Sequence, residues 1–257
     1  MSQQLLIRAS PWIFTIITVA LWEAACRLLH VRPVLVPPPS MVAIELAEFP
    51  LWFAQQSFYT LMVTLAGFAL ATVLGILFAI VITEWKLLDR LLFPLFVALN
   101  SVPKVALAPL FIIWFGTGAE PKVAIAFLIA IFAIVIDAAL GLRSVPPDTL
   151  DLAKTLGGSR LKVLTRIKIF CAMPHIFAGA KVAMSLALVG AIVGEFVSSQ
   201  RGLGWVILSA QGTFDTPRVF AAITILAVLG LALVGAIGVA ERLALPWHHS
   251  SGHHAGS

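Results

Sequence analysis

Charged residues are scarce in this sequence of 257 residues. They make up 11% of the chain, against about 25% in a typical soluble domain, whereas apolar residues make up 60%. The mean hydropathy is +1.03. This composition excludes an ordinary soluble protein and predicts an all-α integral membrane protein, in contact with lipid and with no room for an additional large soluble domain.

The sequence also lacks the residue patterns of several kinds of site. Cys26 and Cys171 have neither metal-ligand spacing nor the density of a disulfide framework. There is no Gly-x-x-x-x-Gly-Lys-Ser/Thr phosphate loop and no nucleophile–base motif. We therefore expect a non-catalytic chain with no catalytic residue, no metal site and no bound cofactor. The stretch MSQQLLIRASPW lacks the basic cluster and cleavage site of a secretory signal, so we expect the first apolar span to be retained.

Six apolar stretches are long enough to cross a membrane as helices. They cover residues 11–29, 60–83, 91–115, 123–142, 176–197 and 219–240. Glu23 and Arg27 are four residues apart and are expected to pair on one face of the first helix. The third stretch contains three prolines, whose missing backbone hydrogen bonds must be replaced by neighbouring groups or water. We predict a single membrane domain over residues 1–245.

Basic residues set the predicted orientation. Alternate connections collect ten Lys or Arg on one side and five on the other, which places both termini and the loop 143–175 in the cytoplasm. Six of the ten fall between Arg143 and Lys168, so charge placement gives no reason to expect nucleic-acid binding. Outside, the triple proline in segment 30–50 predicts an extended connector. The tail 246–257 is expected to be disordered, a weak metal-binding tract and the remnant of an added tag being the alternatives.

The cytoplasmic stretch PPDTLDLAKTLGGSRLKVLTRIKIF, residues 146–170, predicts two short capped helices. Asp148 is expected to be the N-cap of the first, with Asp151 in its first turn. Gly157 and Gly158 are expected to end it, and Ser159 to cap the second. A helix of about two turns is marginal alone. Its apolar face therefore needs a partner, either the rest of this chain or a groove on another protein; that face consists of Leu152, Ala153 and Leu156.

Three segments resemble a known family. The cytoplasmic stretch is similar to the Glu-Ala-Ala loop of permease subunits from binding-protein-dependent ABC importers: Asp151-Leu152-Ala153 stands in place of Glu-Ala-Ala, and Gly157 is in register. The segments SVPKVALAPLFIIWFGTG at 101–118 and GEFVSSQRGLGWVI at 194–207 resemble the nitrate/sulfonate/taurine branch of that family. The resemblance extends over about three quarters of the chain, from the second predicted span to the sixth.

The resemblance implies a type I ABC importer permease in a bacterial inner membrane. It implies a homodimer, two cytoplasmic ABC ATPase subunits that hold ATP and Mg, and an external or periplasmic solute-binding protein. The solute would be small and anionic, such as a sulfonate, nitrate or bicarbonate. The cytoplasmic helix would couple the permease to the ATPase. The residues assigned to this coupling are Asp151, Leu152, Ala153, Lys154, Thr155, Leu156, Gly157, Gly158 and Ser159.

Polar residues in or beside the spans are candidates for a translocation pathway or gate. They are Asn100, Ser101, Lys104, Glu195, Ser198 and Ser199. Lys104 either faces a central cavity, where it would attract an anion, or extends to the membrane surface or pairs with an acid. Glu195 either gates the outer end of its helix or anchors the loop that carries Ser198 and Ser199.

Small residues line one face of the fifth predicted span, where Gly190 and Gly194 are four residues apart. Such a face permits close helix packing in lipid, either within the chain or at a homodimer seam. Asp137 and Lys181 are expected to orient helices. Two other functional classes remain open on the residues alone, an ion-coupled secondary carrier and a membrane-embedded enzyme or scaffold. Neither an inverted repeat nor a catalytic constellation is evident in the sequence.

Overall fold

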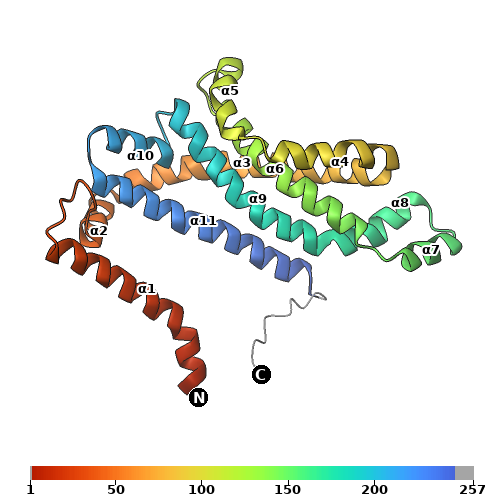
Figure 1. Cartoon of the computed structure of the whole chain (residues 1–257), viewed down its shortest axis with the longest axis horizontal. Coiled ribbons are helices and arrows are strands. Elements are labelled where there is room, and N and C mark those ends of the chain that lie inside the picture. The colour runs from red at the N-terminus through yellow and green to blue at the C-terminus, as the bar shows by residue number, and fades with distance from the viewer. Residues whose placement is uncertain (1, 247–257) are drawn as a thin grey trace. The chain divides into compact units, whose positions relative to one another are not determined.

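The computed structural model describes residues 2–246 and is built from helices (Figure 1). No strand occurs in that part of the chain. The element η1 is a 3₁₀-helix and η2 is a π-helix. In order the elements are α1 (Ser2–Leu28), α2 (Pro39–Glu48), α3 (Pro50–Glu84), α4 (Lys86–Asn100), η1 (Lys104–Leu107), α5 (Ala108–Phe115), α6 (Glu120–Arg143), α7 (Pro147–Thr155), α8 (Arg160–Val163), η2 (Leu164–Lys168), α9 (Ile169–Ser198), α10 (Leu203–Gly212) and α11 (Thr216–Ala244). Most of the predicted tail, residues 247–257, lies outside the described residues.

The chain divides into two compact units. One contains the chain up to Tyr59 together with Gln200–Ala227, and the other contains Thr60–Ser199 and the chain from Val228 onward. The first unit holds α1, α2 and α10. The second holds α4 to α9, including the stretch that resembles the coupling loop.

Four helices within the described residues are long and apolar enough to cross a membrane. They are α3, α6, α11 and the continuous helix Arg160–Ser198 formed by α8, η2 and α9. They coincide with four of the six predicted spans. The first predicted span, 11–29, lies in α1, which is not among these helices, and it stays a prediction.

The third predicted span is not one helix. It is divided between α4 and η1–α5, which meet at a bend of 86°. Pro103, just before η1, has φ −70° and ψ 84°, outside the helical region, and its missing N–H cannot continue α4. Pro94 lies within α4 without ending it. The prolines therefore correctly indicated a disrupted span, but the prediction of a single helix over 91–115 was wrong.

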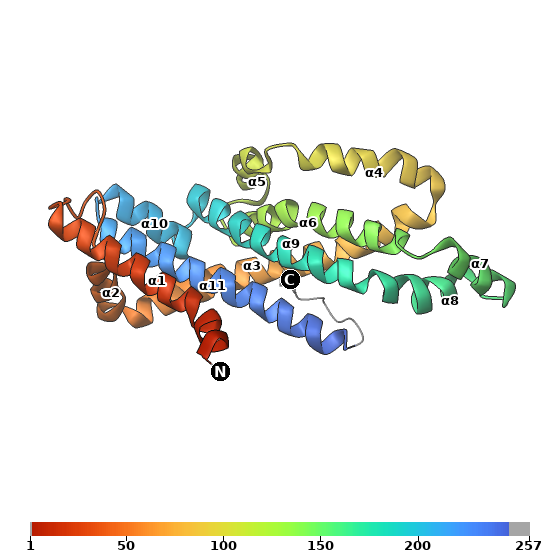
Figure 2. The ribbon, with the colours of Figure 1, turned by 60° about the horizontal axis from the view of Figure 1, so that its bottom comes forward.

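The core of the second unit is formed where α6 packs between small residues of α3 and α9. Helices α6 and α9 lie side by side along much of their length (Figure 2). A Cβ added to Gly190 would be 2.6 Å from the Cα of Ala126, and one added to Gly194 would be 2.9 Å from the Cα of Lys122. Gly67 of α3 approaches Ala126 as well. The intrachain interpretation of the small-residue face is thus confirmed.

In the first unit, the prediction for segment 30–50 was partly wrong. The backbone is extended at Pro38, but Pro39 begins the helix α2 because proline suits the first helical position. The predicted pair in α1 is confirmed, with Arg27 Nε 2.6 Å from Glu23 Oε1. Glu23 also accepts hydrogen bonds from the backbone N–H and hydroxyl of Ser40, at 3.0 and 2.9 Å. This acid therefore joins the end of α1 to the start of α2.

Candidate functional site

The candidate coupling helix is α7, and it begins two residues earlier than predicted, at Pro147 instead of Thr149. Pro147 occupies its first position, and the N–H groups of Thr149 and Leu150 donate to the carbonyl of Pro146 at 3.1 and 3.3 Å. Asp148 is therefore not the N-cap. It lies in the first turn, where its carboxylate still favours the positive end of the helix dipole. The ring of a proline at the first helical position fixes φ near the helical value. Pro147 therefore favours a helix that begins at this residue.

The end of α7 follows the prediction. Gly157 has φ +74°, the left-handed conformation that glycine adopts most readily. The N–H of Gly158 then donates to the carbonyl of Ala153 at 2.9 Å, the long-range bond of a Schellman motif. Ser159 caps the next helix, since its hydroxyl accepts from the backbone N–H of Lys162 at 3.4 Å. These contacts hold α7 and α8 in a defined turn.

Leu152 on α7 and Leu156, just after the last residue of α7, are exposed rather than packed. The exposed fraction is 61% for Leu152 and 77% for Leu156, whereas Ala153 is half-buried. Asp151 is exposed, and its backbone carbonyl accepts a hydrogen bond from the Thr155 hydroxyl at 2.9 Å. Most of the predicted apolar face is therefore not covered by the described part of this chain.

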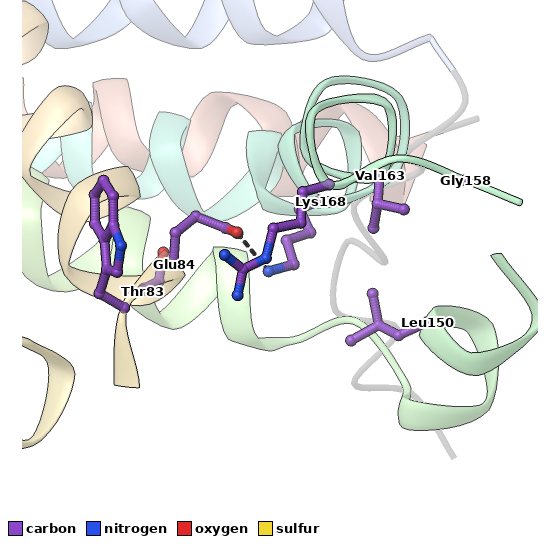
Figure 3. A pocket seen from close by; sticks show the side chains of 8 residues that line it. Thr83, Glu84, Leu150, Gly158, Val163 and Lys168 are labelled. Atoms are coloured by element: carbon purple, nitrogen blue, oxygen red, sulfur yellow. Dashed lines mark hydrogen bonds and ion pairs between the residues drawn. The ribbon is translucent and has the colours of Figure 1, made fainter. Parts of the chain in front are cut away.

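The helix after the turn runs without a break into a membrane span. From Arg160 to Ser198 it is 39 residues long, and Pro174 lies inside it without ending it. Lys168 ties its beginning to α3, since its Nζ is 2.5 Å from Glu84 Oε1 (Figure 3). Residues 160–175 of the predicted cytoplasmic loop are thus helical and continuous with the fifth span.

The first group of pathway candidates lies at the bend between α4 and η1. Lys104 Nζ donates to the backbone carbonyl and the side-chain oxygen of Asn100, at 2.8 and 3.0 Å. It also lies 4.6 Å from the centre of the Phe132 ring on α6, within cation–π range. Ser101 is exposed in the turn between them. Lys104 therefore caps the C-terminal end of α4, an arrangement that the sequence did not suggest.

The second group lies at the end of α9. Glu195 is 1% exposed, and one of its carboxylate oxygens accepts a hydrogen bond from the Thr60 hydroxyl of α3 at 2.8 Å. Its backbone carbonyl accepts from the N–H of Ser199 at 3.2 Å. The Ser198 hydroxyl is buried and has no hydrogen-bond partner within the described structure. The Glu195 side chain therefore joins α9 to α3, whereas its backbone carbonyl holds the first residue of the loop after α9.

Lys122 and Thr60 also belong to the polar residues of the second unit, although neither was among the predicted site residues. Lys122 is one of the five bases that the charge count places on the outer side, but it is 2% exposed and donates to the carbonyls of Thr117 and Gly118 at 3.2 and 2.6 Å. Its position at the start of a predicted span was the available signal. Thr60, which is fully buried, is 135 residues from Glu195 in the sequence, so no local pattern could connect them.

Comparisons with known proteins agree with the resemblance seen in the sequence. Residues 71–243 match the family described as the binding-protein-dependent transport system inner membrane component. The formylaminopyrimidine transport permease protein ThiX of Halalkalibacterium halodurans is 34% identical over 240 residues, which cover 92% of this chain and 95% of ThiX. The taurine transport system permease protein TauC of Escherichia coli is 29% identical, over 90% of this chain and 87% of TauC.

A solved structure shares the fold. A chain of the MetNI methionine ABC transporter, in inward-facing conformations, aligns with a TM-score of 0.67 at 15% identity. The alignment covers 75% of this chain and 96% of that one. At this identity the likeness concerns the fold, and it agrees with the all-α, importer-permease architecture expected from the sequence.

Proposed function

The chain belongs to the family of binding-protein-dependent transport system inner membrane components, and we propose that it works as a homodimer with two cytoplasmic ABC ATPase subunits. It is an integral membrane permease subunit of an ABC importer. We infer that a binding protein outside a bacterial inner membrane delivers the solute, and that both termini of the permease are cytoplasmic. ATP and Mg would be held by the ATPase subunits.

The exposed leucines of α7 carry the proposal that this helix, with the turn to Ser159, couples the permease to the ATPase. Leu152 and Leu156 project from a short helix whose C-terminal end is fixed by a Schellman motif and a following N-cap. A two-turn helix with an uncovered apolar face fits a groove on another protein. Because α8 continues into a membrane span, a displacement of α7 would move that span as well.

Replacement of both leucines by serine tests the coupling role. A fully buried leucine contributes about 1.5–3 kcal/mol, so we expect Leu152→Ser/Leu156→Ser to weaken ATPase retention at least tenfold. Solute-stimulated ATP hydrolysis in proteoliposomes should fall with it. The matched control is Leu51→Ser at the start of α3, since Leu51 is 79% exposed and outside the proposed contact. Undiminished ATPase co-purification and uptake in the double variant would contradict the assignment.

We propose a small anionic solute, such as a sulfonate, nitrate or bicarbonate. The similarity to TauC, named for taurine transport, supports this class. Lys104 at the broken span adds a positive charge near a polar bend. A neutral heterocycle is the second candidate, because ThiX is named for formylaminopyrimidine transport.

A thermal-shift screen of the cognate binding protein distinguishes these solutes. It should include taurine, nitrate, bicarbonate and formylaminopyrimidine, followed by competition in ATP-driven uptake by the reconstituted transporter. An anion that stabilises the binding protein and competes for uptake is the expected result. Stabilisation by formylaminopyrimidine alone would replace the anion with the heterocycle and leave the permease assignment intact.

A further inference from the structure

A cavity of about 560 Å³ lies in the second unit beside the start of the long helix. Its walls come from the end of α3, the turn at Trp85, helix α7 and the segment α8–η2. Figure 3 shows Glu84 and Lys168 pointing toward one another on one side, with Leu150 and Val163 directed into the same space from α7 and α8. The cavity thus combines charged groups with an apolar wall.

The charged side chains that line the cavity leave one positive charge in excess. Arg160 and Lys168 contribute two positive charges and Glu84 one negative charge. Lys168 pairs with Glu84, and each of these side chains is only 19% exposed. None of the ion pairs found among residues 2–246 includes Arg160, so its guanidinium is available to a ligand. A ligand with a single negative charge would neutralise the cavity.

The π-helix η2 brings the two bases onto one face. Arg160 and Lys168 are eight residues apart, which in a regular α-helix would separate them by about 80° around the axis. The π-turn over Leu164–Lys168 accommodates an extra residue. The angle around the axis between Arg160 and Lys168 then approaches the value for residues seven apart in an α-helix, about 20°. Both side chains can therefore contact the same anion.

The surroundings of the cavity suit an amphiphilic ligand. Trp85 follows directly after the candidate span α3 and is 54% exposed, as is typical of tryptophan at a membrane surface. Beyond it, Leu87 and Leu91 of α4 are exposed, at 69% and 61%. An acyl chain can lie along these leucines while a polar headgroup occupies the cavity. Basic pockets between membrane helices bind anionic lipid headgroups in this manner.

We propose that this cavity binds the headgroup phosphate of an anionic phospholipid between Arg160 and Lys168. The apolar wall formed by Leu150 and Val163 would contact the glycerol and upper acyl region. The ligand would connect the corner between α3 and α4 to the beginning of the long helix. The proposal goes beyond transport and requires only that α3 ends at a membrane surface.

Native mass spectrometry of the purified permease–ATPase complex tests the site. Wild type is expected to retain one phosphatidylglycerol per permease chain through stepwise delipidation, and to retain phosphatidylcholine at least tenfold more weakly. Arg160→Gln should weaken phosphatidylglycerol retention about tenfold, and Lys168→Arg should preserve it. The matched control is Lys162→Gln, because Lys162 is an exposed base on the same helix that does not line the cavity.

Arg160→Gln is the decisive variant because Arg160 is exposed and takes no part in an ion pair of the described fold. An unchanged melting temperature would show that it retains the native structure. Equal retention of phosphatidylglycerol in Arg160→Gln and wild type would overturn the proposal. Displacement of the lipid by inorganic phosphate at millimolar concentration would assign the site to a soluble phosphate instead. Retention of phosphatidylcholine as strong as that of phosphatidylglycerol would also refute it.

Discussion

The close approach of α6 and α9 makes Gly190→Ala a sharp test of the fold. The added Cβ would lie 2.6 Å from Ala126 Cα, 3.0 Å from Ala126 N and 3.1 Å from the Ile125 carbonyl oxygen. Ordinary contacts of a Cβ begin at 3.4 Å, so the nearest contact would be 0.8 Å too short, and α9 and α6 would have to move apart locally. Ala126 cannot retreat freely, because Gly67 of α3 packs against it as well.

The expected effect is a net loss of stability. Overpacking of this kind costs about 1–3 kcal/mol, whereas alanine in a helix interior gains about 0.5–1 kcal/mol over glycine. For a chain of this size, 1 kcal/mol changes the melting temperature by about 2–4 °C. We therefore expect Gly190→Ala to melt several degrees below wild type when unfolding is followed by tryptophan fluorescence in a fixed detergent.

Gly235→Ala is the matched control. Gly235 lies within α11, and a Cβ added there meets no atom within 4 Å. Only the gain in helix propensity applies, so its melting temperature should equal or exceed that of wild type. A Gly190→Ala protein as stable as wild type, or equal losses in both variants, would refute the packing argument.

Two polar contacts of the second unit can be tested by further variants. Thr60→Val removes the hydroxyl that donates to the buried Glu195 and should lower the free energy of unfolding by about 1–3 kcal/mol. Thr60→Ser keeps the hydroxyl and should lose less stability. Equal losses in the two variants would contradict the role of this hydrogen bond. Lys181 and Glu241 form a partly exposed ion pair between α9 and α11, so Lys181→Glu should destabilise the protein modestly. The double variant with Glu241→Lys should recover about 0.2–1 kcal/mol, and absence of recovery in denaturant titrations would show that the pair contributes nothing.

The turn between α7 and α8 could be predicted because its determinants are local. The left-handed Gly157 and the N-cap Ser159 act within a few residues of their own positions. The misassigned start of α7 has the same local origin. An aspartate and a proline competed for neighbouring positions, and the fixed φ of Pro147 placed the first helical turn before Asp148.

The bend at Pro103 could be predicted only in part. Proline excludes a continuous backbone hydrogen-bond pattern, and the sequence indicated that disruption. The angle of 86° depends on the packing of η1 and α5 against α6, which involves residues distant in the sequence. The cap that Lys104 forms on Asn100 is a consequence of that bend and could not be anticipated without it.

The buried partner of Glu195 could not be predicted from local patterns. A charged residue near the end of a span suggested either a gate or an anchor. The contact with Thr60 arises from the packing of α9 against α3, between residues 135 apart in the sequence. Hydrophobic periodicity indicated which segments are helices but not which helices meet.

The uninterrupted helix from Arg160 to Ser198 has a mechanical consequence. At 1.5 Å per residue its 39 residues extend for about 58 Å. One end follows the turn after α7, and the other carries Glu195. No loop separates these ends, so a tilt imposed at Ser159 has to appear at Glu195 unless it is absorbed at the π-turn or at Pro174. The hydrogen bond between Glu195 and Thr60 lies near the far end of this helix, so its loss would report that such a tilt has been transmitted along the helix.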